Sequence, residues 1–351
     1  MTEQNSDERT TMQITLHTDA AVFDALADEW RDLMGRAKAA PIFMTPDYQK
    51  IWWKHLGEGE LRILAIREPE SQELLGIASL FVHDQELHYV GCVDVSDYLD
   101  FIIDQRYCAP VFQAIVDYLA VELASEWDKG FFCSLSEKSS TLNVLVELAQ
   151  AKGWTTDVRH EDVCPIIALP ATWDDYLAGI KKKQRHEIRR KLRKAENAAQ
   201  TRWYVIEDSA DLSDEAIDIF IDLHQRSTTE KEAFWDSAMI AFFRALVKRF
   251  AQLGWLKFYF VEMNGEPASA LLCFDYRNEI LVYNSGFDVE KFGYLSPGNI
   301  IISYSIQHAI ELGRARYDFL RGDEVYKFRF GAIAEDVLGV RIFKQSTDAH
   351  R

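Results

Sequence analysis

The segment YDFLRGDEVYKFRFG, residues 317–331, concentrates side chains that could carry out acid–base chemistry. Its first residues continue a predicted strand, and Gly322 allows a sharp turn where that strand ends. Strand ends are where α/β proteins commonly place reactive groups. Asp323 or Glu324 could accept a proton from an amine, directly or through water, because an amine with a pKa of about 10 is protonated at neutral pH. Tyr326 could in turn protonate a leaving group.

The same segment contains cations that could hold an anionic substrate or a phosphate group. These are Arg321, Lys327 and Arg329. A structural alternative is a turn locked by surface ion pairs, which are common and contribute little to stability. The position at a strand end favours a functional turn over a merely ion-paired one.

The loop KFGYLSPGN, residues 291–299, has the features of a helix start that could receive a phosphate. Ser296 is a good N-cap, Pro297 suits the first helical position, and Gly298 would let a ligand approach the backbone. Asn299 follows in the same turn. Free N–H groups at a helix start, with the helix dipole behind them, favour an anion. The structural alternative is simply a well-capped helix.

A third candidate is the segment SDYLDF, residues 96–101, in which Asp97 and Asp100 flank Tyr98. Two carboxylates in an aromatic, strand-like run are unusual, because each must point outward or lose hydration on burial. Either carboxylate could orient or deprotonate an amine. The structural alternative is ordinary alternation, with Tyr98 and Asp100 on one strand face and Asp97 on the other.

These segments lie within an α/β chain in which the order of elements repeats. Each half has two helices, a three-stranded meander, a helix and a strand. The meanders begin at Leu61 and Leu256, and each reaches a glycine at the same offset, Gly91 and Gly286. Asn264-Gly265 is a strong signal for a two-residue hairpin. The expected strands are 61–67, 74–82, 87–91, 131–135, 163–169, 255–263, 267–275, 279–287, 315–320 and 337–344, and the expected helices are 19–38, one after Thr45-Pro46, 110–127, 141–152, 180–199, 213–226, 236–252 and 298–312.

Composition and charge limit the classes of function. A chain of 351 residues suggests two domains, and 48% hydrophobic residues with many aromatics can bury a large core. A net charge of −17 excludes a general binder of nucleic acid or anionic membranes. Residues 181–194 are the exception, because they carry nine basic residues and one acid.

This basic segment is predicted to be an amphipathic helix within residues 180–199. Its apolar stripe is Ile180, Ile188, Leu192, Ala195 and Ala199. Three interpretations compete: a solvated linker helix facing the acidic bulk of the chain, an anion site for a substrate phosphate, and a tRNA contact. The solvated helix is the default, because a tRNA contact would require local charge to overcome the acidic body.

Other features argue against metal, membrane and secretion. Five widely spaced cysteines without a CxxC pair indicate reduced, mostly buried thiols in a cytoplasmic protein. No apolar run suits a secretory signal or a membrane span. No Cys/His cluster has metal-ligand spacing, so no metal is expected. His224 at a helix end and the Phe234-Trp235 pair are interpreted as structural, and no GxSxG or Walker-type loop occurs.

Six phrases in order resemble the BioF2-like (CelD-type) acetyltransferases, which belong with the FemAB-type peptidyltransferases to the GNAT superfamily. They are PIFMTPDYQKIWWKHLG, SDYLDFIID, KKKQRHEIRRKLRKAE, GEPASALLCF, SGFDVEKFGYLSPGN and YDFLRGDEVYKFRFGA, within residues 40–345. The resemblance implies two tandem GNAT folds and transfer of an acyl group, usually from acyl-CoA, to an amine. FemAB relatives take aminoacyl groups from tRNA instead.

The resemblance also implies roles for residues. SPGN would cradle the donor phosphates, although the GNAT loop usually reads Arg/Gln-x-x-Gly-x-Gly/Ala and Pro297 removes one donor. A backbone N–H of a bulged strand near Asn284 to Gly286 would face the thioester oxygen, and Tyr326 would protonate the leaving thiolate. Acidic residues of the first domain, here Asp97 or Asp100 beside Tyr98, would line an acceptor groove between the domains.

We therefore expect an α/β protein with two tandem GNAT-like domains, each a mixed, mostly antiparallel sheet flanked by helices, joined by a basic linker helix. The expected ranges are a disordered tail over 1–11, an N-terminal domain over 12–170, the linker over 171–200 and a donor-binding C-terminal domain over 201–346. The expected function is N-acyl transfer, with acetyl from acetyl-CoA foremost, to a small-molecule, sugar-derived or cell-envelope amine, without metal or DNA. The alternatives are aminoacyl transfer from tRNA and a non-catalytic scaffold in polysaccharide synthesis.

Overall fold

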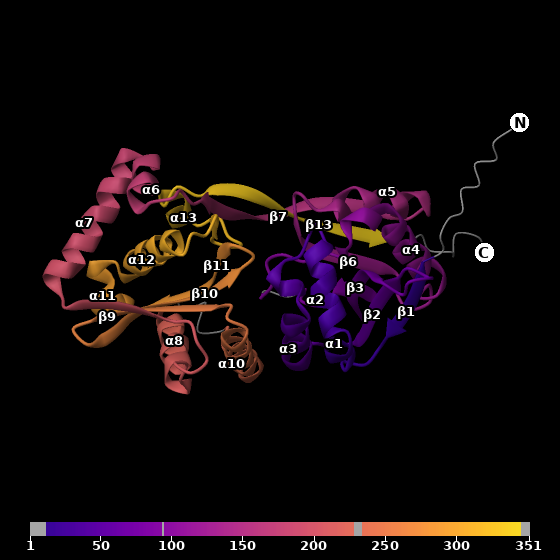
Figure 1. Ribbon diagram of the computed structural model, residues 1–351, viewed down its shortest axis with the longest axis horizontal. Helices are drawn as coiled ribbons and strands as arrows, with labels where there is room; N and C mark the ends of the chain where they lie inside the picture. The colour runs from indigo at the N-terminus through magenta and orange to yellow at the C-terminus, as the bar shows by residue number, and fades with distance from the viewer. Residues whose placement is uncertain (1–11, 93–94, 228–233, 345–351) are drawn as a thin grey trace, which may run out of the picture. The chain divides into compact units, whose positions relative to one another are not determined.

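The structure, a computed structural model, describes residues 12–92, 95–227 and 234–344 (Figure 1). Two compact units divide the chain between them: the first takes the described residues up to Glu161 and those from Asp336, and the second spans Asp162–Glu335. The chain enters the second unit within strand β7 (Thr155–Ala168) and leaves it within strand β13 (Ile333–Phe343). The expected tail over residues 1–11 lies outside the described residues.

The first unit is built on a mixed sheet in which the predicted meander is confirmed. The strands follow the order β1 (Gln13–His17), β2 (Glu60–Arg67), β3 (Leu74–His83), β4 (Glu86–Tyr89), β6 (Lys129–Ser136) and the second part of β13, with β5 (Ile102–Ile103) on β3. Neighbours are antiparallel except β4 and β6, which are parallel. Strand β3 lies centrally and is buried from Leu74 to Phe81, which explains its nearly continuous apolar sequence.

Among the described residues of this unit, five α-helices accompany the sheet. They are α1 (Val22–Ala25), α2 (Ala27–Arg36), α3 (Pro46–Leu56), α4 (Cys108–Val121) and α5 (Val144–Ala151). The helix expected over 19–38 is therefore two helices, separated at Leu26. The predicted cap of α3 is confirmed, because the Thr45 side chain accepts a hydrogen bond from the Tyr48 N–H and Pro46 occupies the first turn.

In the second unit the strands follow the order β7, β12 (Arg316–Asp318), β11 (Glu279–Phe287), β10 (Glu266–Tyr276), β9 (Leu256–Met263) and β8 (Thr201–Ile206). Neighbours are antiparallel except β11 and β12, which are parallel. Asn264 and Gly265 join β9 to β10 with φ angles of 55° and 79°. The predicted hairpin is therefore confirmed, because its tight turn needs positive φ at both positions.

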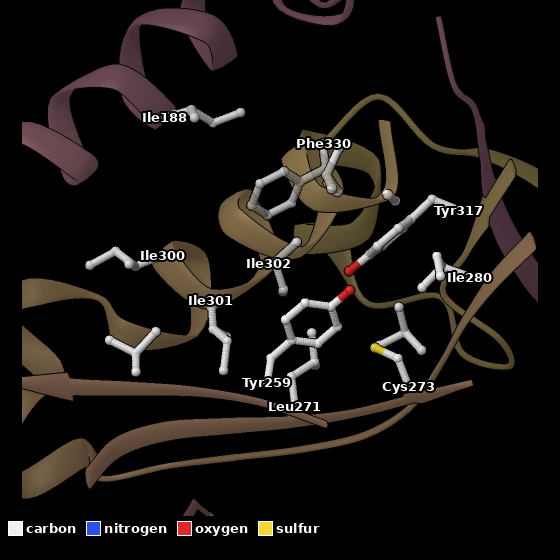
Figure 2. Packing of buried hydrophobic residues seen from close by; sticks show 14 of the residues in the cluster. Ile188, Tyr259, Leu271, Cys273, Ile280, Ile300, Ile301, Ile302, Tyr317 and Phe330 are labelled. Atoms are coloured by element: carbon white, nitrogen blue, oxygen red, sulfur yellow. The ribbon is translucent and has the colours of Figure 1, made fainter. Parts of the chain in front are cut away.

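Helices cover both faces of this sheet (Figure 1). They are α6 (Trp173–Gly179), α7 (Lys182–Ala198), α8 (Asp214–Ser227), α10 (Ser237–Gln252), α11 (Val289–Phe292), α12 (Pro297–Glu311) and α13 (Val325–Arg329). Figure 2 shows the core between α12 and the strands, where Ile300–Ile302 pack beside Tyr259, Leu271 and Cys273, and Ile188 of α7 joins the cluster. Burial of such apolar surface is the main stabilising contribution to this unit.

The division into units differs from the sequence-based ranges in two respects. Strand β13 pairs with β6, so the last described strand belongs to the first unit rather than to a domain over 201–346. Helices α6 and α7, expected as a linker over 171–200, are part of the second unit, because Tyr176, Leu177 and Ile188 are buried in its core. Strand pairing and burial between distant segments decide these boundaries, and local composition does not reveal either.

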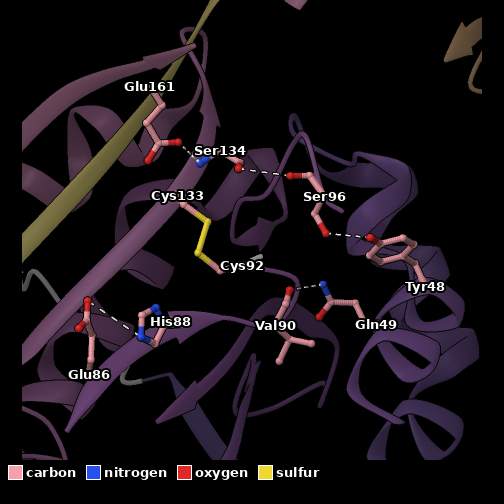
Figure 3. The surroundings of a disulfide bond; sticks show 10 residues. All are labelled: Tyr48, Gln49, Glu86, His88, Val90, Cys92, Ser96, Cys133, Ser134 and Glu161. Carbon is pink, nitrogen blue, oxygen red and sulfur yellow. Dashed lines mark hydrogen bonds and ion pairs between the residues drawn. A yellow bond between two sulfur atoms is a disulfide. The ribbon is translucent and has the colours of Figure 1, made fainter. Parts of the chain in front are cut away.

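The expectation of five reduced cysteines is wrong for one pair. Cys92 follows β4, Cys133 lies on β6, and their sulfur atoms are bonded, with Cα atoms 6.3 Å apart (Figure 3). The parallel pairing of β4 with β6 brings the two residues together across 41 residues of sequence. Cys108 and Cys273 are free thiols.

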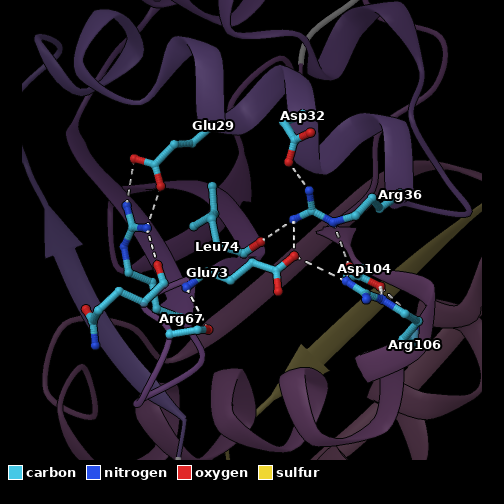
Figure 4. Close-up of polar contacts among 10 residues, drawn as sticks. Glu29, Asp32, Arg36, Arg67, Glu73, Leu74, Asp104 and Arg106 are labelled. Carbon is cyan, nitrogen blue, oxygen red and sulfur yellow. Dashed lines mark hydrogen bonds and ion pairs between the residues drawn. The ribbon is translucent and has the colours of Figure 1, made fainter.

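An ion-pair network joins α2 to the segment that follows β5 (Figure 4). The Asp104 carboxylate is fully buried and accepts hydrogen bonds from the Arg36 Nε at 2.8 Å and the Arg106 Nη2 at 2.7 Å. Arg36 also donates to the Leu74 carbonyl at 2.8 Å. The hydrogen bond from Arg106, together with Arg36, holds the pKa of Asp104 well below its usual range.

We expect Asp104→Asn to lower the free energy of unfolding by about 1–3 kcal/mol. Asparagine keeps the cap on the Arg106 N–H but removes the buried counter-charge of Arg36 and Arg106, whose remaining carboxylate partners, Asp32 and Glu73, are exposed. Urea unfolding measures this difference. A folded-state pKa below the unfolded value stabilises the protein above about pH 4 and loses that effect as the pH falls further. Asp24→Asn, which removes an exposed ion pair with Lys50, is the control and should change the value by less than about 0.5 kcal/mol. Equal effects of the two variants would contradict a stabilising role for the buried network.

Candidate active site

The central feature of the second unit is the divergence of β11 from β12. The two strands pair only at Glu279–Leu281, whereas β11 continues along β10 as far as Phe287. A register shift in the β10–β11 ladder makes Tyr283 an extra residue, which forms a β-bulge. The second half of β11 is therefore both bulged and separated from the β12 ladder.

The bulge changes which face of the sheet each residue of β11 meets. Before it, Ile280 and Val282 are part of the core beneath α12. After it, Gly286 faces α8, because a Cβ placed on Gly286 would lie 2.3 Å from the His224 backbone nitrogen. The absence of a side chain at Gly286 therefore lets α8 approach the strand closely. The sequence had instead suggested that Gly286 contacts the acyl donor.

Helix α12 begins next to this part of β11. Pro297 occupies the first turn as predicted, but the expected serine cap is wrong, because Ser296 has a left-handed backbone (φ 60°) and its side chain makes no capping hydrogen bond. A Cβ on Gly298 would meet the Phe287 ring at 3.4 Å, an ordinary contact. The Asn299 N–H bonds to the Ser296 carbonyl at 3.0 Å. The helix start therefore offers the Gly298 backbone and the positive end of the helix dipole to an anion.

The turn after β12 is held by a buried lysine. Leu320 and Gly322 both have positive φ, 55° and 118°. The Lys327 ammonium, whose side chain is 3% exposed, donates to the carbonyls of Leu320, Arg321 and Gly322 at 3.3, 2.6 and 3.1 Å. It also pairs with the Glu324 carboxylate at 2.9 Å. These bonds use the ammonium to maintain the turn, whereas the sequence suggested that Lys327 contacts substrate.

The proposed proton-transfer residues lie on this turn and on the short helix α13. Asp323 is exposed, as is Arg329, whereas Arg321 is half-buried. Burial raises the pKa of Tyr326, and the charges of Glu324 and Cys273 raise it further. Within the described part of the chain, no residue makes a hydrogen bond to the Tyr326 hydroxyl. Tyr326 therefore stays protonated and can donate a hydrogen bond.

Three parts of the predicted site come together around the second half of β11. The start of α12 lies near Phe287, since a Cβ added to Gly298 would be 3.4 Å from the Phe287 ring. Tyr326 packs against the core cluster to which Cys273 belongs. Cys273 lies on β10 directly beside the bulge. A helix start that could receive a phosphate, a backbone bulge and a phenol hydroxyl therefore belong to one unit.

The segment 96–101 belongs to the first unit and is fixed from several sides. The Tyr48 hydroxyl lies 2.9 Å from the Ser96 hydroxyl (Figure 3), and the Leu99 N–H donates to the Ser134 carbonyl at 3.0 Å. Asp97 and Tyr98 are half-buried. They remain candidates for the acceptor side, and the expected groove between the domains stays a prediction.

Asp100 has different surroundings. Its side chain is buried and accepts hydrogen bonds from the Ser139 and Thr141 hydroxyls, each at 2.6 Å, and from the Phe101 N–H at 2.8 Å. Burial raises the pKa of this carboxyl to about 6, while the hydrogen bonds oppose the shift. These contacts favour a role for Asp100 in holding the turn at residues 139–141 rather than in removing a proton from an acceptor.

Three residues that the sequence did not assign to chemistry surround the bulge. His224, 3% exposed on α8, lies with its Nε2 2.5 Å from the Asn284 Oδ1. The Trp235 indole N–H donates to the His224 Nδ1 at 2.9 Å. From the same helix, Ser227 Oγ accepts from the Phe287 N–H at 2.9 Å. The contacts of His224 with Asn284 and of Ser227 with Phe287 each span 60 residues, and no local pattern could have indicated them.

The basic helix α7 packs by its predicted apolar stripe, since Ile188, Ala195 and Ala199 are buried. Its cations are mostly exposed. Among the described residues, their carboxylate partners are Glu187 of the same helix and Asp174 of α6. Lys194 and Arg185 donate to backbone carbonyls instead. The sequence suggested that the acidic bulk of the chain neutralises these cations, but among the described residues their ion pairs are with Glu187 and Asp174.

No three or more His, Cys, Asp or Glu side chains of the described residues are grouped so that they could hold a metal ion. In the same residues, no helix has the length and apolar character needed to cross a bilayer.

Part of the chain matches a known domain family, and the fold is similar to several solved structures. Residues 182–328 match the model of the acetyltransferase (GNAT) domain family. The fold is similar to that of FemX, with a TM-score of 0.63 and 13% identity over 95% of this chain and 98% of FemX. It is also similar to L-PGS from Bacillus licheniformis (TM-score 0.57, 9% identity, 92% and 93% covered). A tandem GNAT protein from the clavulanic acid biosynthesis pathway has a TM-score of 0.52 at 11% identity, with 95% and 100% covered.

No curated protein sequence matches the chain. The match to the family model shows a GNAT-type acetyltransferase domain within residues 182–328. The two-unit fold is similar to those of FemX and of a tandem GNAT protein.

Proposed function

We propose that the protein is an N-acyltransferase that moves an acyl group, with acetyl as the first candidate, from acyl-CoA to an amine. The acceptor is a small-molecule, sugar-derived or cell-envelope precursor. The amine nitrogen attacks the thioester carbonyl directly, a C–N bond forms and the C–S bond breaks. Asp323 takes the amine proton, Tyr326 donates a hydrogen bond to the departing sulfur, and no covalent enzyme intermediate forms.

The observation that carries this proposal is the bulged, diverging half of β11 beside the start of α12. A backbone N–H at such a bulge can stabilise the negative charge that develops on the thioester oxygen, which contributes a few kcal/mol, about 2.7–4. The α12 start suits the donor phosphates, because an anion is favoured at the positive end of a helix of 15 residues. The resemblance of the sequence phrases to CelD-type acetyltransferases supports the same donor.

Release of free thiol from acetyl-CoA in the presence of an amine panel tests the function, and mass spectrometry of the products identifies the acceptor. The exposed cations of α7 and the FemX-like fold favour aminoacyl-tRNA as a second candidate donor. If the protein transfers an aminoacyl group from charged tRNA and does not turn over acetyl-CoA, then aminoacyl-tRNA is the donor instead of acyl-CoA. Turnover of neither donor with any amine of the panel would count against the proposed function.

The donor site leads to a prediction for Gly298→Val. The backbone at Gly298 can accommodate a side chain, since the added Cβ would make only ordinary contact with Phe287, so the fold should remain intact. The valine methyl groups would occupy the space from which a phosphate approaches the helix start, and the dissociation constant of the donor should rise at least about tenfold, which corresponds to 1.4 kcal/mol. Isothermal calorimetry with CoA measures this change.

The control for this prediction is Gly179→Val at the end of α6, where the structure also has open space around the added Cβ. Its CoA affinity should match the wild type. Unchanged affinity in Gly298→Val would remove the donor phosphates from this helix start.

A further inference from the structure

We propose that His224 is a positioning residue for acyl transfer. Its Nε2–H holds the Asn284 amide, and with it the bulged part of β11, in the orientation that presents the backbone to the thioester oxygen. The inference rests on the proposed acyltransferase function. It adds a residue from α8 to a site that otherwise consists of β11, α12 and the turn after β12.

The hydrogen bonds determine the tautomer of His224. An indole N–H can only donate, so the 2.9 Å contact from Trp235 makes Nδ1 an acceptor without a proton. The ring proton therefore lies on Nε2 and is donated to the Asn284 Oδ1 at 2.5 Å. The same Oδ1 accepts from the Ser285 N–H at 3.0 Å. Rotation of the amide by 180° would place its NH₂ group against the His224 Nε2–H and the Ser285 N–H, which are both donors. Trp235 therefore sets the tautomer of His224, and His224 in turn fixes the orientation of the amide.

Asn284 is the first residue after the bulge at Tyr283. Because β12 pairs only as far as Leu281, the strand beyond that point requires support from elsewhere. The last turns of α8 supply it at three positions. His224 holds Asn284, the α8 backbone lies against Gly286, and Ser227 Oγ accepts from the Phe287 N–H at 2.9 Å. Helix α8 thus takes the place of a neighbouring strand where the backbone must be placed accurately.

Accuracy matters here because an N–H that stabilises an oxyanion acts only at hydrogen-bond distance. A displacement of about 1 Å can lower the rate by about 10²-fold. We expect His224→Leu to lower kcat by about 10–100-fold while the KM for the donor changes by less than about threefold, since the donor phosphates bind at α12. His224→Gln retains an N–H donor on a side chain of similar reach and should recover most of the lost kcat.

The matched control is His308→Leu. His308 lies in the last turn of α12, and its Nδ1 is 3.1 Å from the Tyr259 hydroxyl, so its loss removes one histidine hydrogen bond from the same unit, away from the bulge. We expect kcat to remain close to the wild-type value. A loss as large as that of His224→Leu would show general destabilisation and overturn the positioning role.

Two readouts are independent of activity. Nitrogen-15 NMR of the histidine rings should show His224 as the Nε2–H tautomer, and an Nδ1–H tautomer would overturn the inference. Hydrogen exchange at the Ser285 and Phe287 amides should be faster in His224→Leu than in the wild type. If the wild type transfers no acyl group, the proposed function fails, and these readouts still decide whether His224 orders the bulge. An active wild type with unchanged kcat and exchange in His224→Leu would overturn the inference.

Discussion

Replacing Asp323 with asparagine should lower the rate of acyl transfer by about 10²–10⁴-fold, the usual contribution of a general base. Asparagine keeps the volume of the side chain but cannot accept the proton. The structure favours Asp323 over its neighbour, because the Glu324 carboxylate is paired with the Lys327 ammonium at 2.9 Å and helps to hold the turn. Asp323 is exposed and remains available to an acceptor amine.

The dependence on pH distinguishes a base from a binding residue. Part of the lost rate should return at high pH, where the amine is already deprotonated, and donor affinity should be unchanged. Initial rates between about pH 6 and pH 10, a range that spans the pKa of the amine, measure the recovery of activity. Calorimetry with CoA measures the donor affinity. The control is Asp211→Asn, an exposed carboxylate of the same unit, whose rate should match the wild type. If Asp323→Asn is fully active and Asp97→Asn is not, the base belongs to the first unit.

The secondary structure could largely be predicted, because its signals are local. The apolar runs of β9–β11, the Asn264-Gly265 turn and the proline at the start of α12 all act within a few residues. Elements without a strong local pattern were not expected. Strand β8 is short and only half-buried, and α13 lies within a mixed run of charges. Their formation depends on contacts with strands and turns elsewhere in the second unit.

The candidate site could be predicted only in part, for a related reason. The residue types of the turn after β12 indicate chemistry, but not which charges remain available. Lys327 is buried because the backbone at Leu320 and Gly322 directs three carbonyls toward it. That conformation depends on pairing with β7, where the Gly322 N–H donates to the Val163 carbonyl at 2.9 Å. The sequence shows that a lysine lies near the site, but only the tertiary structure shows that its ammonium holds the turn after β12.

Tyr326→Phe should lower kcat by about 10–100-fold, equivalent to losing a hydrogen bond of about 1.5–3 kcal/mol to a charged group. Burial, with the charges of Glu324 and Cys273, raises the pKa of Tyr326 above its usual value, so the phenol is neutral throughout the working range. A thiol has a pKa of about 8.5, and full proton transfer from such a phenol to a thiolate would be unfavourable. Tyr326 therefore acts by hydrogen bonding to the sulfur as charge develops there, rather than by complete protonation.

The thioester leaving group provides the test of this assignment. An aryl thioester releases a more acidic thiol than acetyl-CoA does, so its departing sulfur needs less stabilisation by a hydrogen bond. The decrease in kcat caused by Tyr326→Phe should therefore be smaller with an aryl thioester than with acetyl-CoA. The decrease in kcat should also be independent of pH below about 10, because the side chain at position 326 is uncharged in both the wild type and Tyr326→Phe. Tyr176→Phe is the matched control: it removes a buried hydroxyl that donates to the Phe330 carbonyl at 2.7 Å, and it should lower stability without changing kcat. An equal loss with both thioesters would mean that Tyr326 does not contact the leaving sulfur, and its role would then be to pack the turn that carries Asp323.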